Sequence, residues 1–75
     1  MTKVKMITIE IDVAADTEIG EVLTMIQKQD GRIKKHIANG PAGHPTLFIQ
    51  FDHYVLAENF LMEYCGDTDV ETYQI

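Results

Sequence analysis

The sequence predicts an α+β domain with the ferredoxin-like split βαβ plan (βαββαβ), a four-stranded antiparallel sheet with two helices on one face. Two observations predict it. The hydrophobic pattern along the chain predicts the order strand, helix, strand, strand, helix, strand. A chain of 75 residues can also maintain only one hydrophobic core, so we expect residues 1–75 to form a single domain.

The first half of the chain contains the clearest strand and a helix. In residues 4–13, VKMITIEIDV, the apolar residues of one parity are Ile7, Ile9, Ile11 and Val13. Such alternation is typical of a half-buried strand. The next segment has helical spacing, with an apolar stripe of Ile19, Val22, Leu23 and Ile26. Asp16 or Thr17 can cap this helix, and Gly31 can end it.

Two strands joined by a loop are predicted next. Residues 32–38, RIKKHIA, indicate an edge strand, because Lys35 lies between Ile33 and Ile37, and a bulge near His36 would fit as well. Residues 46–51, TLFIQF, are apolar on both parities and indicate a central strand. The connecting residues 39–45, NGPAGHP, suit a wide hairpin, because they lead into a strand and not into the helix start that a phosphate cradle needs. Whether this loop also binds a ligand is left open.

The last part of the chain predicts a helix and a closing strand. Asp52 can cap the helix, and Gly66 can end it. Its apolar residues at helical spacing are Ala57, Phe60, Leu61 and Tyr64. Residues 69–75, DVETYQI, then indicate a short acidic edge strand.

Strand parity divides the sheet residues between two faces. The residues expected beneath the helices are Ile7, Ile9, Ile11, Leu47, Ile49 and Phe51. The opposite surface, the open sheet face, is expected to carry Met6, Thr8, Glu10, Phe48 and Gln50. Burying its large side chains would be favourable by roughly 1.5–3 kcal/mol each. Tyr73 of the expected closing strand is placed on the same face, so the predicted partner-binding residues are Met6, Thr8, Phe48, Gln50 and Tyr73.

Charge and composition limit the classes of partner. The net charge is −6, and residues 51–75 carry six acidic side chains and no Lys or Arg. Such a charge disfavours nucleic acid and anionic lipid as general partners. The alternative is a nucleic-acid surface on the local basic patch of Lys28, Arg32, Lys34 and Lys35. No apolar run approaches membrane-spanning length and Cys65 is the single cysteine, so we expect a cytoplasmic protein with no membrane contact and no internal disulfide.

No motif for catalysis or metal binding stands out. The sequence has no serine, which excludes a Ser-His-Asp triad. Asp52 and His53 are adjacent, so they project in different directions, and Cys65 near a helix end is interpreted as a small core residue. His44 and His53 flank opposite ends of a predicted strand, and His36 and His44, which could approach across the hairpin, are too few ligands for a closed metal site. We assign no catalytic residue, no metal and no cofactor.

The span from Ile19 to Ile75 resembles, in the order of its elements, the small regulatory βαββαβ modules of the ACT and Lrp-effector type. The portion that carries the resemblance is TLFIQFDHYVLAENFLMEYCGDTDVETYQI. Such modules form dimers through sheet edges or faces, so the resemblance implies self-association. ACT modules begin their first helix after a Gly-containing ligand turn, whereas this chain has AADTEIG, and amino-acid binding is not carried over.

The function expected from these observations is that of a small non-catalytic protein-binding module. It would bind another protein or a second copy of itself, as a homodimer, through the open sheet face or an edge strand. Small acidic chains of this kind suit a phage or mobile-element (viral) factor that inhibits or redirects a host protein. The alternatives are the nucleic-acid binder described above and a dimeric small-molecule regulatory or enzymatic domain.

Overall fold

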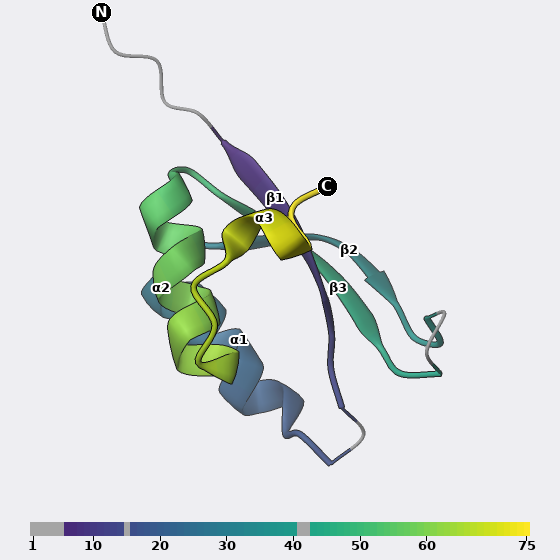
Figure 1. Ribbon diagram of the computed structural model, residues 1–75. Coiled ribbons are helices and arrows are strands. Elements are labelled where there is room, and N and C mark those ends of the chain that lie inside the picture. The colour runs from purple at the N-terminus through teal and green to yellow at the C-terminus, as the bar shows by residue number, and fades with distance from the viewer. Residues whose placement is uncertain (1–5, 15, 41–42) are drawn as a thin grey trace, which may run out of the picture.

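The computed structural model describes residues 6–14, 16–40 and 43–75. Its elements are β1 (Ile7–Asp12), α1 (Ile19–Lys28), β2 (Arg32–Ile37), β3 (Thr46–Phe51), α2 (Tyr54–Cys65) and α3 (Val70–Tyr73). The strands form one antiparallel sheet in the order β1-β3-β2, with β3 in the centre. Helices α1 and α2 pack together against this sheet (Figure 1).

The predicted four-stranded sheet with two helices is wrong, because the expected fourth strand is a helix. Residues Val70–Tyr73 form α3, and the described residues contain three strands and three helices. In this segment the backbone pairs with β1 at Gln74, which forms an isolated bridge with Ile9, and at Ile75, whose amide donates to the Thr8 carbonyl at 3.1 Å. The closing strand implied by the resemblance to ACT-type modules is therefore missing.

Local hydrogen bonds at two aspartates favour the helix over the strand. The Asp69 amide donates to Asp67 Oδ1 at 2.9 Å, and Thr72 Oγ1 donates to Asp69 Oδ2 at 2.9 Å. Bonds of this kind offer the backbone a turn in place of a sheet ladder. The turn also allows Val70 to become fully buried in the core.

The strand parities were predicted correctly. One cluster on the helix side of the sheet contains Ile7, Ile9, Ile11, Val13, Val22, Ile26, Leu47, Ile49, Phe51, Ala57, Phe60, Leu61 and Val70. All six residues expected beneath the helices belong to it. Phe48 and Met6, of the other parity, do not.

Helix caps and the bulge differ from the predictions in detail. Neither Asp16 nor Thr17 caps α1, whose N-cap is Glu18, and Asp52 does not cap α2, whose N-cap is His53. Asp52 accepts a bond from Arg32 instead. Gly66 ends α2 in the left-handed conformation, with φ of 74°, as predicted. The bulge in β2 lies between Ile33 and Lys35, two positions before His36.

After α1 the left-handed residue is Asp30, with φ of 55°, and not Gly31. Gly31 is needed because it packs closely against the core. A Cβ at position 31 would lie 2.7 Å from Phe51 Cε1 and 2.8 Å from Ile26 Cγ2, both in the core. We therefore expect Gly31→Ala to lower the free energy of unfolding by about 1–3 kcal/mol, the usual cost of overpacking. Urea denaturation measures this change.

The matched control for this prediction is Gly20→Ala in α1. A Cβ at Gly20 would meet no atom within 4 Å, and alanine favours a helix. The free energy of unfolding should stay the same or rise by up to about 1 kcal/mol. Equal effects of the two substitutions would contradict the packing argument.

Candidate functional site

The open sheet face consists of cross-strand rows that run from β1 across β3 to β2. One row contains Glu10, Phe48 and Lys35, and the next contains Thr8, Gln50 and Arg32. In each row the β3 residue lies in the middle, because β3 is the central strand. An acidic edge on β1 and a basic edge on β2 thus flank Phe48.

Phe48 is the main apolar side chain of this face. It is half-buried and does not belong to the core cluster. Lys35 Nζ lies 5.8 Å from the centroid of its ring, within range of a cation–π interaction. The long lysine side chain therefore shields part of the ring in the single chain.

The structure places the predicted partner-binding residues in two different regions. Thr8, Phe48 and Gln50 share the open sheet face, and Met6, just before β1, is 57% exposed. Tyr73 does not join them. It lies on α3 and packs against the core on the helix side, so its placement on the open sheet face was wrong.

Two of the four residues of the alternative basic patch are paired with carboxylates of the same chain. Lys28, at the end of α1, pairs with Glu63 of α2 at 2.9 Å. Arg32 pairs with Asp52 at 2.7 Å. Lys34 occupies the bulge of β2, and Lys35 lies over Phe48. Two of the four charges are therefore balanced by carboxylates within the chain.

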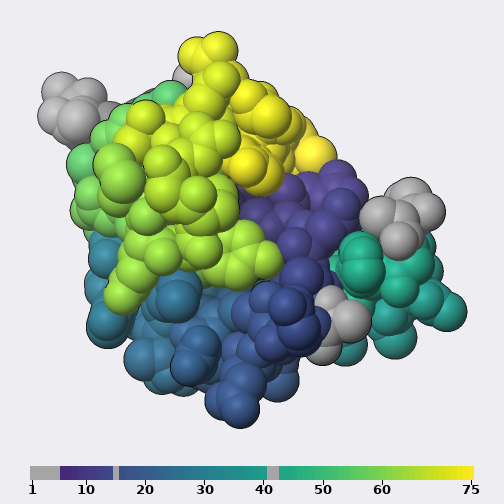
Figure 2. Space-filling model, turned by 60° about the horizontal axis from the view of Figure 1, so that its bottom comes forward, coloured from purple at the N-terminus to yellow at the C-terminus, as the bar shows by residue number. Residues whose placement is uncertain are grey.

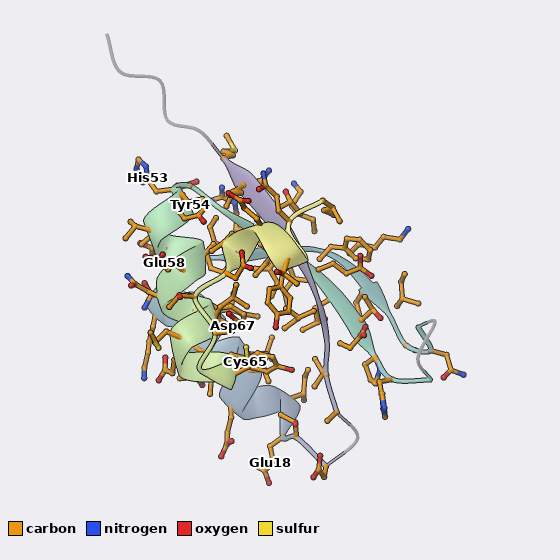
Figure 3. All side chains as sticks on the ribbon, in the orientation of Figure 1. Glu18, His53, Tyr54, Glu58, Cys65 and Asp67 are labelled. Atoms are coloured by element: carbon orange, nitrogen blue, oxygen red, sulfur yellow. The ribbon has the colours of Figure 1, made fainter. Side chains whose placement is uncertain are left out.

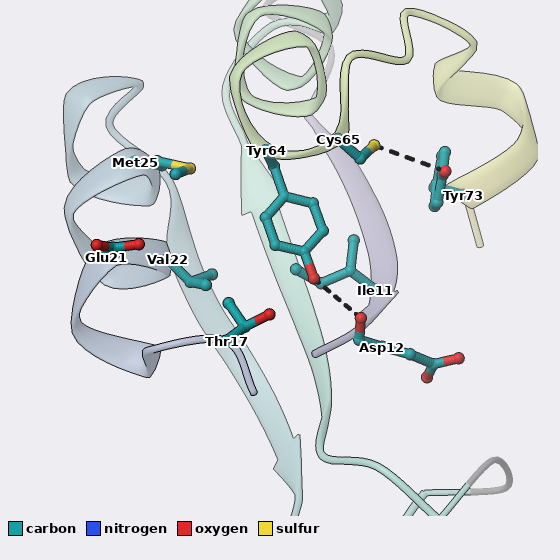
Figure 4. Close-up of a pocket in the computed structure, with 9 residues that line it drawn as sticks. All are labelled: Ile11, Asp12, Thr17, Glu21, Val22, Met25, Tyr64, Cys65 and Tyr73. Carbon is teal, nitrogen blue, oxygen red and sulfur yellow. Dashed lines mark hydrogen bonds between the residues drawn. The ribbon is translucent and has the colours of Figure 1, made fainter. Parts of the chain in front are cut away.

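The structure also shows a groove that sequence reasoning missed. The groove has a volume of about 500 Å³, and its lining consists of Ile11, Asp12, Thr17, Glu21, Val22, Met25, Tyr64, Cys65 and Tyr73 (Figure 4). In Figure 2 the surfaces of β1 (purple), α1 (blue), the end of α2 (light green) and α3 (yellow) meet on one face. The residues of the groove come from segments far apart in the sequence, so no residue spacing within one segment could have predicted the groove.

The groove combines an apolar floor with hydroxyl and carboxylate groups. Tyr64 Oη donates to the Asp12 carbonyl at 2.9 Å, and this bond fixes the ring across the groove. Asp12 and Glu21 are the acidic residues among those that line the groove. The Asp12 carboxylate points away from Tyr64 (Figure 4) and accepts a bond from Thr46 Oγ1 at 3.0 Å, so Asp12 meets the groove through its carbonyl.

Cys65 and Tyr73 form a contact at the rim of the groove. Cys65 is exposed at the end of α2, so its interpretation as a core residue was wrong. Its sulfur lies 3.8 Å from Tyr73 Oη, which also donates to Asp67 Oδ2 at 3.4 Å. Cys65 is the last residue of α2 and Asp67 follows it, whereas His53 and Tyr54 lie at the beginning of α2 (Figure 3).

Hydrogen bonding to Cys65 raises the pKa of Tyr73 to about 12, with smaller contributions from burial and from the charges of Cys65 and Asp67. The folded state therefore holds the phenol proton more tightly than the unfolded chain does. The resulting stabilisation is present below pH 10 and is lost as the pH rises from about 10 to 12.

Cys65→Ala should lower the pKa of Tyr73 toward 10 by removing the largest cause of the shift. Tyrosine ¹³C chemical shifts followed against pH measure it directly. Tyr54 is the internal control, because desolvation and then the charges of Glu71, Glu58 and Asp69 raise its pKa, and Cys65 is not among the causes. An unchanged Tyr73 titration in the variant would contradict the assigned cause.

The described residues contain neither a metal-binding cluster nor a membrane-spanning helix. Within residues 6–14, 16–40 and 43–75, no group of three or more His, Cys, Asp or Glu side chains is arranged to hold a metal ion. Over the same residues, every helix is too short or too polar to cross a membrane. Comparisons of the chain with protein-family models, curated proteins and solved structures find no match.

Proposed function

We propose that this protein is a small non-catalytic protein-binding module and that its binding surface is the open sheet face. The observation that carries the proposal is Phe48, a large aromatic side chain at the centre of a sheet face that contributes nothing to the core cluster. Aromatic residues surrounded by polar groups are typical centres of protein interfaces. The neighbouring Glu10 and Lys35 provide opposite charges that can orient a partner.

The face is a better candidate than the β2 edge. The outer edge of β2 is interrupted by the bulge at Lys34 and carries lysines, two features by which edge strands avoid pairing with other chains. Binding through the face needs no backbone hydrogen bonds, so these features do not oppose it. We place this activity in the cytoplasm, because the single cysteine, Cys65, is exposed and has no partner for an internal disulfide.

Site-specific photo-crosslinking tests the proposal. A photoreactive phenylalanine analogue at position 48 should form covalent adducts with a protein partner in cells of the natural host. The same analogue at Val55 is the matched control, because Val55 is 54% exposed on α2, outside the sheet. We expect adducts from position 48 and none of the same mass from position 55.

Competition separates specific adducts from random ones. Excess unlabelled chain should suppress the adducts of position 48, whereas excess Phe48→Asp chain should not, because a carboxylate at the centre of the interface would be buried without a partner. The proposal fails if no adduct depends on position 48, or if the Phe48→Asp chain competes as well as the unchanged chain.

A further inference from the structure

The charges beside Phe48 indicate what covers the open sheet face. We infer that a second copy of this chain does so, with the two sheets packed face to face about a two-fold axis parallel to β3. In this arrangement Glu10 of each copy faces the partner's Lys35, and the two Phe48 rings meet between these pairs. The inference rests on the proposed function and adds the identity of the partner.

The order of residues across the sheet provides the first step. Glu10, Phe48 and Lys35 lie opposite one another on β1, β3 and β2. Neighbouring strands are about 4.8 Å apart, so the backbones of Glu10 and Lys35 lie at similar distances from that of Phe48, one on each side. The row is therefore nearly antisymmetric in charge about β3.

Symmetry provides the second step. A two-fold axis parallel to β3 exchanges the β1 side of one copy with the β2 side of the other, so each Glu10 meets a Lys35. An axis in the same plane but perpendicular to the strands would place Glu10 on Glu10 and Lys35 on Lys35. Like charges directly opposite each other are unfavourable. The charges of the Glu10–Phe48–Lys35 row thus favour the axis parallel to β3 over the perpendicular one.

The next row is compatible with the selected axis. Its members are Thr8 on β1, Gln50 on β3 and Arg32 on β2. The axis places the Thr8 hydroxyl, an acceptor, opposite the partner's Arg32, a donor, and brings the two Gln50 amides together. Arg32 keeps its bond to Asp52 at 2.7 Å and has further N–H groups to donate.

The size of the face sets the strength of the dimer. Strands about 20 Å long and spaced about 4.8 Å apart give this sheet a face of roughly 300 Å² per copy, well below the 800 Å² of a standard interface. Lys35 must also leave the Phe48 ring to reach the partner's Glu10. We therefore expect a weak dimer that forms at high protein concentration and weakens as salt screens its ion pairs.

Charge exchange tests the arrangement by sedimentation equilibrium at low salt. Glu10→Lys and Lys35→Glu should each raise the dissociation constant of the dimer about tenfold or more, because each creates two like-charge contacts. The double variant with both substitutions should restore the dimer, because each lysine again faces a glutamate. The perpendicular axis predicts no such rescue.

Net charge provides the control. Glu10→Lys reduces the charge of the chain from −6 to −4, so general repulsion between acidic molecules would predict stronger association, the opposite of our expectation. Glu71→Lys makes the same change on α3, away from the sheet face, and should not weaken the dimer. The double variant keeps the charge of −6.

The outcomes separate the inference from the proposed function. A chain that stays monomeric at about 1 mM and low salt, or single variants that the double variant does not rescue, would overturn the face-to-face dimer. If position 48 still forms adducts with a different protein in that case, the proposed function stands and only the partner is wrong. If, in addition, no adduct depends on position 48, the proposed function fails as well.

Discussion

Phe60→Ala is expected to remove most of the stability of this protein. Phe60 is completely buried in α2, with ring centroids 5.6 Å from Phe51 and 5.5 Å from Tyr64. Truncating a buried phenylalanine costs about 3–5 kcal/mol, because the apolar transfer energy is lost and a cavity remains. The free energy of unfolding of a 75-residue domain is typically roughly 4–11 kcal/mol, so this one substitution removes a large part of it.

Urea denaturation followed by circular dichroism measures the loss. The matched control is Met62→Ala in the same helix, where the side chain is 53% exposed and the change should stay within about 0.5 kcal/mol. Similar denaturation midpoints for the two variants would mean that Phe60 does not hold α2 on the sheet.

Val70→Asp is expected to detach α3 and the last residues of the chain. Val70 is fully buried, and it joins the four-residue helix α3 to the core. A carboxylate at this position would be buried without a partner, at a cost of several kcal/mol, unless the segment moves into water. Because α3 has only four residues, local detachment costs less than global unfolding.

Amide hydrogen exchange distinguishes the two outcomes. The amides of Gln74 and Ile75, which donate to Val70 and Thr8, should lose protection by at least tenfold, whereas Ile49 in the central strand should keep most of its protection. Glu71→Gln, on the same helix but exposed, is the control and should change neither. Retained protection at Ile75 in Val70→Asp would contradict this role of Val70.

Regular periodicity made β1, α1 and α2 predictable, and a continuous apolar run did the same for β3. In β1 every second residue from Ile7 is buried, and in α2 Ala57, Phe60 and Leu61 follow the helical repeat. These patterns report which face is buried, so they also located the open sheet face and its Phe48. Periodicity does not depend on distant residues, which is why it could be read without a structure.

Short segments and contacts between distant residues were not predictable. The five residues from Asp69 to Tyr73 fit a strand as well as a turn of helix, and the bonds of Asp67 and Asp69 decided between them. Asp52 suited a helix cap by its position, but Arg32 competes for its carboxylate. The groove is lined partly by Tyr73 of α3. Because the sequence analysis predicted a strand in place of α3, it could not place Tyr73 beside the groove.

The missing fourth strand affects how molecules of this protein can assemble. The outer side of β1 is covered by Ile75, which bonds to the Thr8 carbonyl, and by the Tyr64 hydroxyl, which bonds to the Asp12 carbonyl. The other margin, β2, is distorted at Lys34. Neither margin is a flat template, which opposes the addition of further copies edge to edge. We therefore expect higher concentration to favour contacts between sheet faces over growth along the strand edges.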